Sequence, residues 1–168
     1  MVKKVVILSG APGSGKSYVA NHLMKDNDVW LSRDKVRTGI RQAINSNDYF
    51  PVTSTTEDQI WHSMVKEMIW QSDADTLYID QTTLNWRAFT KLWDGVRLDA
   101  AGVPVTFMRL DVPLKVCLER NSKRTGFERV PDSSLINMWE SFQKSKEQDI
   151  PAEFQDKVVV VHLKHENS

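Results

Sequence analysis

The segment "GAPGSGKS", residues 10–17, constrains the fold of this chain more than any other feature. It follows a short apolar run at 4–9, precedes a helical pattern, and matches G-x-x-x-x-G-K-[ST] at every fixed position. Gly10, Gly13 and Gly15 let the backbone curl without a Cβ clash, so its amides can point inward beside the positive end of the following helix. This stretch predicts a strand, a phosphate-binding loop and a helix, in that order.

The other positions of the loop have predicted tasks of their own. The backbone of Gly13, Ser14 and Gly15 would hold the phosphates of ATP. Lys16 would reach the β- and γ-phosphates, and Ser17 would ligate Mg²⁺. A glycine-rich turn that binds nothing is the alternative, and the flanking strand and helix argue against it. A phosphate cradle leaves open whether the chain is a switch, a mechanical ATPase or a phosphotransferase.

Short apolar runs alternate with helical patterns along the rest of the chain, which indicates crossover units and a parallel α/β sheet of about five strands flanked by helices. Ser54 stands three residues before Glu57, the spacing of a capping box at the start of a helix. We expect strands at 4–9, 28–32, 76–80, 104–110 and 157–163, and helices at 15–26, 34–45, 56–71, 85–101, 113–122 and 132–147.

Composition limits the class of protein. A chain of 168 residues suits a single domain, 1–168, that buries its own core. Lysine plus arginine equals aspartate plus glutamate at 22 each, so an anionic partner must be held locally. The one cysteine, Cys117, lies in an amphipathic pattern and is expected to be a buried structural thiol. No signal peptide or membrane-length apolar run occurs, which predicts a cytoplasmic protein without a membrane partner.

The stretch "LSRDKVRTGIR", residues 31–41, is the first candidate for the acceptor side of the site. Asp34, Arg37 and Arg41 would share one face of a helix. In a phosphotransferase the carboxylate would accept the proton of an attacking hydroxyl, and Arg37 would hold a neighbouring phosphate. The alternative is an acid in the first helical turn that favours the helix dipole and pairs with Arg37.

The strand in "TLYIDQT", residues 76–82, ends on a second candidate acid, Asp80. A carboxylate at this edge of a parallel sheet can orient a Mg²⁺-bound water or accept a hydrogen bond from Ser17. The alternative is an aspartate that closes the strand by forming a turn.

The segment "LERNSKRTGFERVP", residues 118–131, is basic and joins two expected helices. Arg120, Lys123, Arg124 and Arg129 surround Gly126. Such a segment suits a lid whose arginine closes on the transferring phosphoryl group. A solvated run of charges is the alternative.

Five segments carry a resemblance to a known family: "SGAPGSGKS", "SRDKVR", "YIDQTTLN", "LDVP" and "ERNSKRTGFERVP". In order and spacing they resemble the P-loop 5′-polynucleotide kinase family, as in the kinase domain of bacteriophage polynucleotide kinase/phosphatase, over residues 3–147. The resemblance implies a P-loop NTPase-type, adenylate-kinase-like fold with a helical lid at about 119–131. It also implies transfer of the ATP γ-phosphate to the 5′-hydroxyl end of DNA or RNA, in nucleic-acid end repair.

The resemblance assigns roles to individual residues. Asp34 would be the general base for the 5′-hydroxyl, and Arg37 would grip the acceptor phosphate. Asp80 matches an active-site acid that would reach Mg²⁺ through water.

On the donor side, Lys16 and Ser17 would serve the ATP phosphates and Mg²⁺. Arg124 matches the lid arginine that engages the ATP phosphates, so Lys16, Asp34 and Arg124 form the catalytic set that the resemblance implies. Arg120 would contribute to nucleotide binding.

Two departures from the family are visible. Its bifunctional members carry a haloacid-dehalogenase-type phosphatase domain with an Asp-x-Asp motif, which these 168 residues lack, so we expect no phosphatase domain and no 3′-phosphatase activity. The loop "DQTTLN" is also one residue longer than that of the family. The expected compartment is the cytoplasm of a bacterium or of a bacteriophage-infected host, and the oligomeric state is open.

Two other functions fit the motifs. A small-molecule P-loop kinase acting on a nucleoside, nucleotide, sugar or antibiotic would share the fold, the lid and an acid near position 34. A binding module whose ATP state controls a partner would use the basic loop as a docking surface.

The aromatic residues divide into two groups. Tyr49 and Phe50, just before Pro51, are candidates for stacking on nucleobases. Most of the tryptophans at helical spacings are expected to pack in the core, and one or two could stack on the bases of an incoming strand; these are Trp61, Trp70, Trp86, Trp93 and Trp139.

Overall fold

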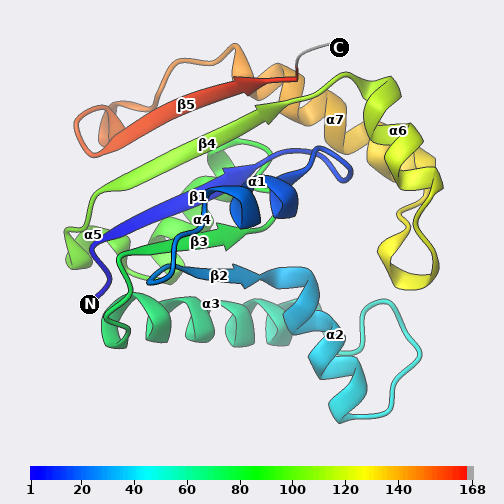
Figure 1. The fold of residues 1–168 in the computed structure, drawn as a ribbon, viewed down its shortest axis with the longest axis horizontal. Helices are drawn as coiled ribbons and strands as arrows, with labels where there is room; N and C mark the ends of the chain where they lie inside the picture. Colours follow the sequence, from blue (N-terminus) through cyan, green and yellow to red (C-terminus); the bar gives the residue numbers. More distant parts are fainter. Residues whose placement is uncertain (166–168) are drawn as a thin grey trace.

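The computed structural model describes residues 1–165 and contains one parallel sheet of five strands in the order β2-β3-β1-β4-β5 (Figure 1). The expected α/β class with a parallel five-stranded sheet flanked by helices is confirmed. The strands are β1 (Lys4–Ser9), β2 (Val29–Ser32), β3 (Thr76–Asp80), β4 (Val105–Asp111) and β5 (Val158–Lys164).

Helices cover both faces of the sheet because its central strands are apolar on both sides. Val5 and Ile7 of β1 belong to the large core cluster that also holds Trp61, whereas Val6 and Leu8 pack in a second cluster on the opposite face. The helices are α1 (Lys16–Leu23), α2 (Arg33–Ala43), α3 (Ser54–Gln71), α4 (Trp86–Gly95), α5 (Leu98–Ala101), α6 (Leu114–Ser122) and α7 (Asp132–Lys146), with 3-10 turns η1 (Gly126–Glu128) and η2 (Ala152–Phe154).

The tryptophans lie where the sequence predicts. Trp61, Trp86 and Trp93 are buried in the core cluster of α3 and α4 against the sheet. Trp70 packs against the same cluster, and Trp139 packs against the cluster of α6 and α7. The prediction of core packing is therefore confirmed for all five.

The expected single helix over 85–101 is wrong, because the chain breaks between α4 and α5. Arg97 adopts a left-handed backbone conformation with φ 57°. Val96 and Leu98 are both buried on either side of it. Residues two apart point about 200° apart on a regular helix, so an unbroken helix could not bury both.

The expected capping box at Ser54 is also wrong. The N-cap of α3 is Thr53, whose side chain accepts a hydrogen bond from the backbone N–H of Thr56 at 3.2 Å. Glu57 does not reach back to the cap, because its carboxylate is buried against the guanidinium of Arg33. A long-range ion pair has replaced the local hydrogen bond that the spacing suggests.

The ends of the parallel strands gather the loops at one edge of the sheet. Figure 1 shows the glycine loop after β1, the start of α2, the cyan loop before α3 and the yellow loop between α6 and α7 at that edge. Doubly wound sheets bind their ligands there. Among residues 1–165, no helix combines the length and the apolar character needed to cross a membrane.

Candidate active site

The loop between β1 and α1 has the curled backbone that its glycines predict. Gly13 and Gly15 have φ values of 82° and 93°, in the left-handed region. A Cβ at Gly13 would lie 2.7 Å from the carbonyl oxygen of Cys117 in α6, so the loop needs glycine here for space as well as for conformation. Cys117 is free and buried, as expected, and burial raises the pKa of its thiol. It therefore supports the loop by packing and is poorly suited to act as a nucleophile.

Lys16 lies folded over this loop. Its Nζ donates to the carbonyl oxygens of Gly10 at 3.0 Å and Ala11 at 3.3 Å. Burial lowers the pKa of Lys16, while the nearby carboxylates of Asp80 and Asp34 act in the opposite direction. An ammonium group held by backbone carbonyls in a poorly hydrated position is well placed to exchange them for phosphate oxygens.

Asp80, at the end of β3, is bound by two donors. Ser17 Oγ donates to Asp80 Oδ2 at 2.7 Å, and the indole Nε1 of Trp30 in β2 donates to the same oxygen at 3.0 Å. The predicted hydrogen bond between Ser17 and Asp80 is confirmed. Among the described residues the second carboxylate oxygen, Oδ1, accepts no hydrogen bond, so it is available to other ligands.

This hydroxyl and carboxylate pair fits the requirements of Mg²⁺. The ion prefers oxygen ligands and keeps several waters, so one or two protein groups together with phosphate oxygens suffice. Ser17 and Asp80 supply such groups beside the phosphate loop. P-loop kinase folds use ATP, typically with Mg²⁺.

We expect Trp30→Phe to weaken the Mg²⁺ dependence of nucleotide binding. The substitution keeps an aromatic ring but removes the donor that orients Asp80, and loss of a hydrogen bond behind a metal ligand typically costs about 10-fold or more in metal affinity. The measurement is a titration of ATP binding with Mg²⁺ by calorimetry. Trp70→Phe is the matched control, because the Trp70 N–H has no partner among residues 1–165. Equal Mg²⁺ midpoints for both variants would contradict a positioning role for Trp30.

The start of α2 presents the two residues of the predicted acceptor side. The helix begins at Arg33, and the Ser32 side chain caps it by accepting from the Lys35 N–H at 3.3 Å. Asp34 lies in the first turn with its side chain 89% exposed, and its Oδ1 accepts from Arg37 Nη1 at 3.2 Å. The interpretation of Asp34 as a first-turn acid paired with Arg37 is therefore confirmed, and both residues line the cleft at the ligand-binding edge.

Glu57 of α3 organises the arginines of α2. Its Oε1 accepts from Arg33 Nε at 2.8 Å and from Arg37 Nη2 at 3.4 Å, and Arg33 Nη2 also bonds to Glu57 Oε2 and Asp58. Burial works to raise the pKa of Glu57, but the hydrogen bonds and charge of Arg33 outweigh it and hold the pKa below its usual range. Arg33 is thus held in a structural ion pair with Glu57. Arg37 contacts both Glu57 and Asp34.

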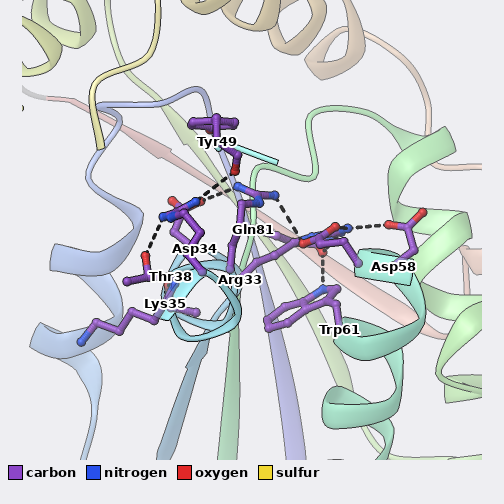
Figure 2. A network of polar contacts seen from close by, with 12 residues as sticks. Arg33, Asp34, Lys35, Thr38, Tyr49, Asp58, Trp61 and Gln81 are labelled. Atoms are coloured by element: carbon purple, nitrogen blue, oxygen red, sulfur yellow. Dashed lines mark hydrogen bonds and ion pairs between the residues drawn. The ribbon is translucent and has the colours of Figure 1, made fainter. Parts of the chain in front are cut away.

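A glutamine extends this network to the sheet. Gln81 Oε1, just after β3, accepts from Arg33 Nη1 at 3.3 Å and from Trp61 Nε1 at 2.7 Å (Figure 2). Lys35 points away from the network (Figure 2), with its Nζ 4.5 Å from the ring centroid of Trp30. The basic residues of α2 therefore have different partners, although the sequence presents them as one cluster.

We expect Glu57→Gln to destabilise the protein in a pH-dependent way. At pH 7 the loss of the shared carboxylate removes the buried charged partner of two guanidinium groups, at a cost of about 1–3 kcal/mol in the free energy of unfolding. The pKa of Glu57 is lowered from 4.5, so its contribution is present above that pH and is lost as the pH falls towards the folded-state value. Urea unfolding should therefore show a smaller difference from the wild type at about pH 3.5 than at pH 7.

Glu67→Gln, at an exposed position on the same helix, is the control and should show no such difference at either pH. A difference for Glu57→Gln that stays constant with pH would contradict the ion-pair explanation.

Arg41 holds the loop that follows α2. Its side chain is buried, and it donates to the carbonyl oxygen of Tyr49 at 3.0 Å and to Thr38 Oγ1 at 2.8 Å. Arg41 is therefore not a solvated charge, and its hydrogen bond to the Tyr49 backbone helps to hold the loop of residues 44–53.

The predicted lid, 119–131, is helical only at its start. It consists of the last turn of α6 and a loop with the single 3-10 turn η1, because Gly126 adopts φ 60° and Pro131 precedes α7. The expectation of a helical lid is corrected to a loop lid between two helices. Buried Asn121 closes its base: Oδ1 accepts from the Val130 N–H at 3.0 Å and Nδ2 donates to the Val130 carbonyl at 2.7 Å.

The arginines of the lid approach the phosphate loop. Arg120 Nη1 donates to the Gly13 carbonyl oxygen at 3.0 Å. Burial is the main cause of the lowered pKa of Lys16, and the positive charge of Arg124 adds to it. Arg120 thus holds the loop, and Arg124 lines the same cleft as Lys16.

One open cleft of about 1810 Å³ brings the candidate residues together. Its walls come from the phosphate loop, α2, the loop of residues 44–53, α4 and the lid. The sequence-predicted residues that line it are Gly13, Ser14, Gly15, Lys16, Ser17, Asp34, Arg37, Asp80, Arg120 and Arg124. Residues predicted from separate motifs therefore share one cleft.

Sequence reasoning missed three residues that shape this site: Trp30, Glu57 and Asn121. Glu57 had a signal, because it precedes Trp61 by four residues and so lies on the buried stripe of α3. An acid on an apolar stripe indicates a buried partner. No local pattern indicated the roles of Trp30 and Asn121. The partner of Trp30 is Asp80, 50 residues away at the end of a strand, and the partner of Asn121 is Val130, 9 residues away in a loop.

The chain matches a known protein family. The AAA_33 family model, described as an AAA domain, matches residues 5–145. Among solved structures, a chain of the Pnkp1/Rnl/Hen1 RNA repair complex is 23% identical with a TM-score of 0.67, covering 89% of this chain and 47% of that one. This chain thus spans about half the length of that relative.

Two further structures resemble the whole chain. A sugar kinase from Janibacter sp. HTCC2649 is 20% identical with a TM-score of 0.58, covering 98% of this chain and 86% of that one. The tunicamycin resistance protein of Deinococcus radiodurans is 17% identical with a TM-score of 0.62, covering 96% and 86%. At these identities the likeness concerns the fold. The chain belongs to the AAA_33 family, as a P-loop kinase-like domain.

Proposed function

We propose that this protein is an ATP-dependent 5′-polynucleotide kinase, which transfers the γ-phosphate of ATP to the 5′-hydroxyl end of DNA or RNA. The observation that carries the proposal is the Asp34 and Arg37 pair, which lines the same cleft as Lys16 and Ser17. A carboxylate beside an arginine suits an acceptor that has both a hydroxyl and an adjoining phosphate. The similarity to a chain of an RNA repair complex and the five sequence segments support the same acceptor.

The proposed chemistry is an in-line displacement. The 5′-oxygen bonds to the γ-phosphorus, the bond from that phosphorus to the bridging oxygen of ADP breaks, and Asp34 takes the hydroxyl proton. Lys16 and Arg124 stabilise the negative charge on the transferring group. Mg²⁺, when bound beside Ser17 and Asp80, neutralises phosphate charge. Arg37 holds the acceptor phosphate next to the reacting nucleoside.

A small-molecule kinase is the second candidate. Its support is the similarity of the whole chain to a sugar kinase and to a gluconokinase from Sinorhizobium meliloti 1021, the latter with 20% identity and a TM-score of 0.55 over 95% of this chain and 82% of that one. Such an acceptor would use Asp34 in the same way. It would have no internal phosphate for Arg37, which is the feature that favours a polynucleotide.

The test is phosphoryl transfer from labelled ATP to a panel of acceptors: 5′-hydroxyl DNA and RNA oligonucleotides, nucleosides, nucleoside 3′-monophosphates and gluconate. The proposal expects oligonucleotides and 3′-monophosphates to be labelled far more efficiently than nucleosides, and Arg37→Ala to remove that preference. Arg87→Ala, an exposed arginine outside the cleft, should keep it. Efficient labelling of gluconate or of a nucleoside without phosphate would overturn the polynucleotide assignment.

A further inference from the structure

We propose that the rings of Tyr49 and Phe127 are the two walls of a slot for the nucleobase of the 5′-terminal nucleotide, with one wall supplied by the lid. This proposal rests on the polynucleotide kinase function proposed above and extends it to the recognition of the base. The rings come from the loop of residues 44–53 and from η1 of the lid, and both line the cleft.

The two rings contact each other on the lining of the cleft. Their centroids are 6.4 Å apart and their planes meet at 51°. The cyan and yellow loops that carry them approach each other at the ligand-binding edge in Figure 1. Phe127 is 39% exposed and lies outside the three buried core clusters, so packing of the core does not explain an apolar ring at the tip of the lid.

The separation of the rings suits a planar guest. Bases stack at intervals of about 3.4 Å, so a base between two rings needs about 7 Å from ring to ring. At 6.4 Å and 51° the two rings are in a direct tilted contact, so a base would enter between them only after the rings turn parallel and move apart.

Arg41 links the two loops that carry the walls. It donates to the carbonyl oxygen of Tyr49 at 3.0 Å, and its Cζ lies 4.3 Å from the ring centroid of Phe127. Arg41 is buried, and its contacts are to the Tyr49 backbone and to one ring, so they leave the Tyr49 ring free to turn. A cation over an aromatic face stabilises the contact between the lid and the 44–53 loop.

The slot lies within one nucleotide of the reacting groups. Arg37 bonds to Asp34, and its Cζ is 5.5 Å from the ring centroid of Tyr49. One nucleotide could therefore reach all three residues. Its hydroxyl would lie at Asp34, its phosphate at Arg37 and its base beside Tyr49. Because a base would contact both walls, acceptor binding would favour closure of the lid that carries Arg124.

The test compares two oligonucleotides that differ only at the 5′-terminal residue, one with a base and one abasic, both with the 5′-hydroxyl. Stacking predicts a KM about 5- to 100-fold higher for the abasic acceptor with the wild-type protein. Phe127→Ala should remove most of this difference while KM for ATP changes little, and Phe127→Trp should restore it. Ile44→Ala, an exposed apolar residue at the start of the same loop region, is the control and should keep the difference.

A binding measurement gives a readout independent of catalysis. An oligonucleotide with 2-aminopurine at its 5′ end should lose fluorescence on binding to the wild-type protein, because stacking quenches this base, and should lose much less on binding to Phe127→Ala or Phe127→Leu.

The outcomes separate the two proposals. Efficient phosphorylation of both oligonucleotides with equal KM, and no quenching, would overturn the slot and leave the kinase function standing. Phosphorylation of neither oligonucleotide, with transfer to a small acceptor, would overturn the proposed function and the slot together.

Discussion

Replacement of Lys16 by methionine is expected to lower kcat for phosphoryl transfer by about 100-fold or more. Methionine keeps an unbranched apolar chain as far as Cε but removes the ammonium group, and loss of one preorganised charge at a transferring phosphoryl group costs this much. Lys16 already lies against the carbonyls of the phosphate loop, in a position where burial lowers its pKa. Its charge therefore acts with little screening by water. The measurement is steady-state transfer from ATP to a 5′-hydroxyl oligonucleotide.

The control for this substitution is Lys115→Met, at an exposed position of α6 outside the cleft, which should leave kcat unchanged. A Lys16→Met protein with the wild-type kcat and only a weaker affinity for ATP would show that Lys16 binds the ground state and the transition state equally and does not speed the transfer step.

Asp34→Asn is expected to lower kcat by about 100- to 10,000-fold, with little change in KM for ATP or for the oligonucleotide. The amide preserves the shape of the side chain and can still accept from Arg37, but it cannot take the hydroxyl proton. Because the Asp34 side chain is 89% exposed, folding should be unaffected, and equal Tm values for the two proteins check this. The measurement is kcat and both KM values, each KM determined with the other substrate saturating.

Asp48→Asn, an exposed acid in the 44–53 loop, is the matched control. Full activity of Asp34→Asn would remove the general base from the mechanism.

Much of the fold could be predicted from local patterns. The apolar run of β1 and the glycine loop after it imply a strand, a turn and a helix, and the structure has this order. The alternation of Val5 and Ile7 with Val6 and Leu8 between the two faces follows from the two-residue period of a strand. The break at Arg97 could not be predicted, because it depends on burying Val96 and Leu98 together.

The candidate site was predictable in its parts but not in its connections. The sequence places Asp34, Asp80 and Arg124 after strands or in a loop, and one edge of a parallel sheet brings such positions together. It does not say which arginine of α2 faces a ligand. Arg33 is bound by Glu57 and Asp58, 24 and 25 residues away, and Arg41 is bound to the backbone of Tyr49.

The amino-acid sequence by itself determined the phosphate loop and the order of strands and helices, because these depend on backbone conformation and on the spacing of apolar residues along the chain. Only the tertiary structure decided the partners of the charged and polar side chains: Glu57 for Arg33, Trp30 for Asp80, and Phe127 opposite Tyr49. The physical reason is that these contacts join segments distant in the chain, and their energies depend on burial and separation, which no local pattern contains.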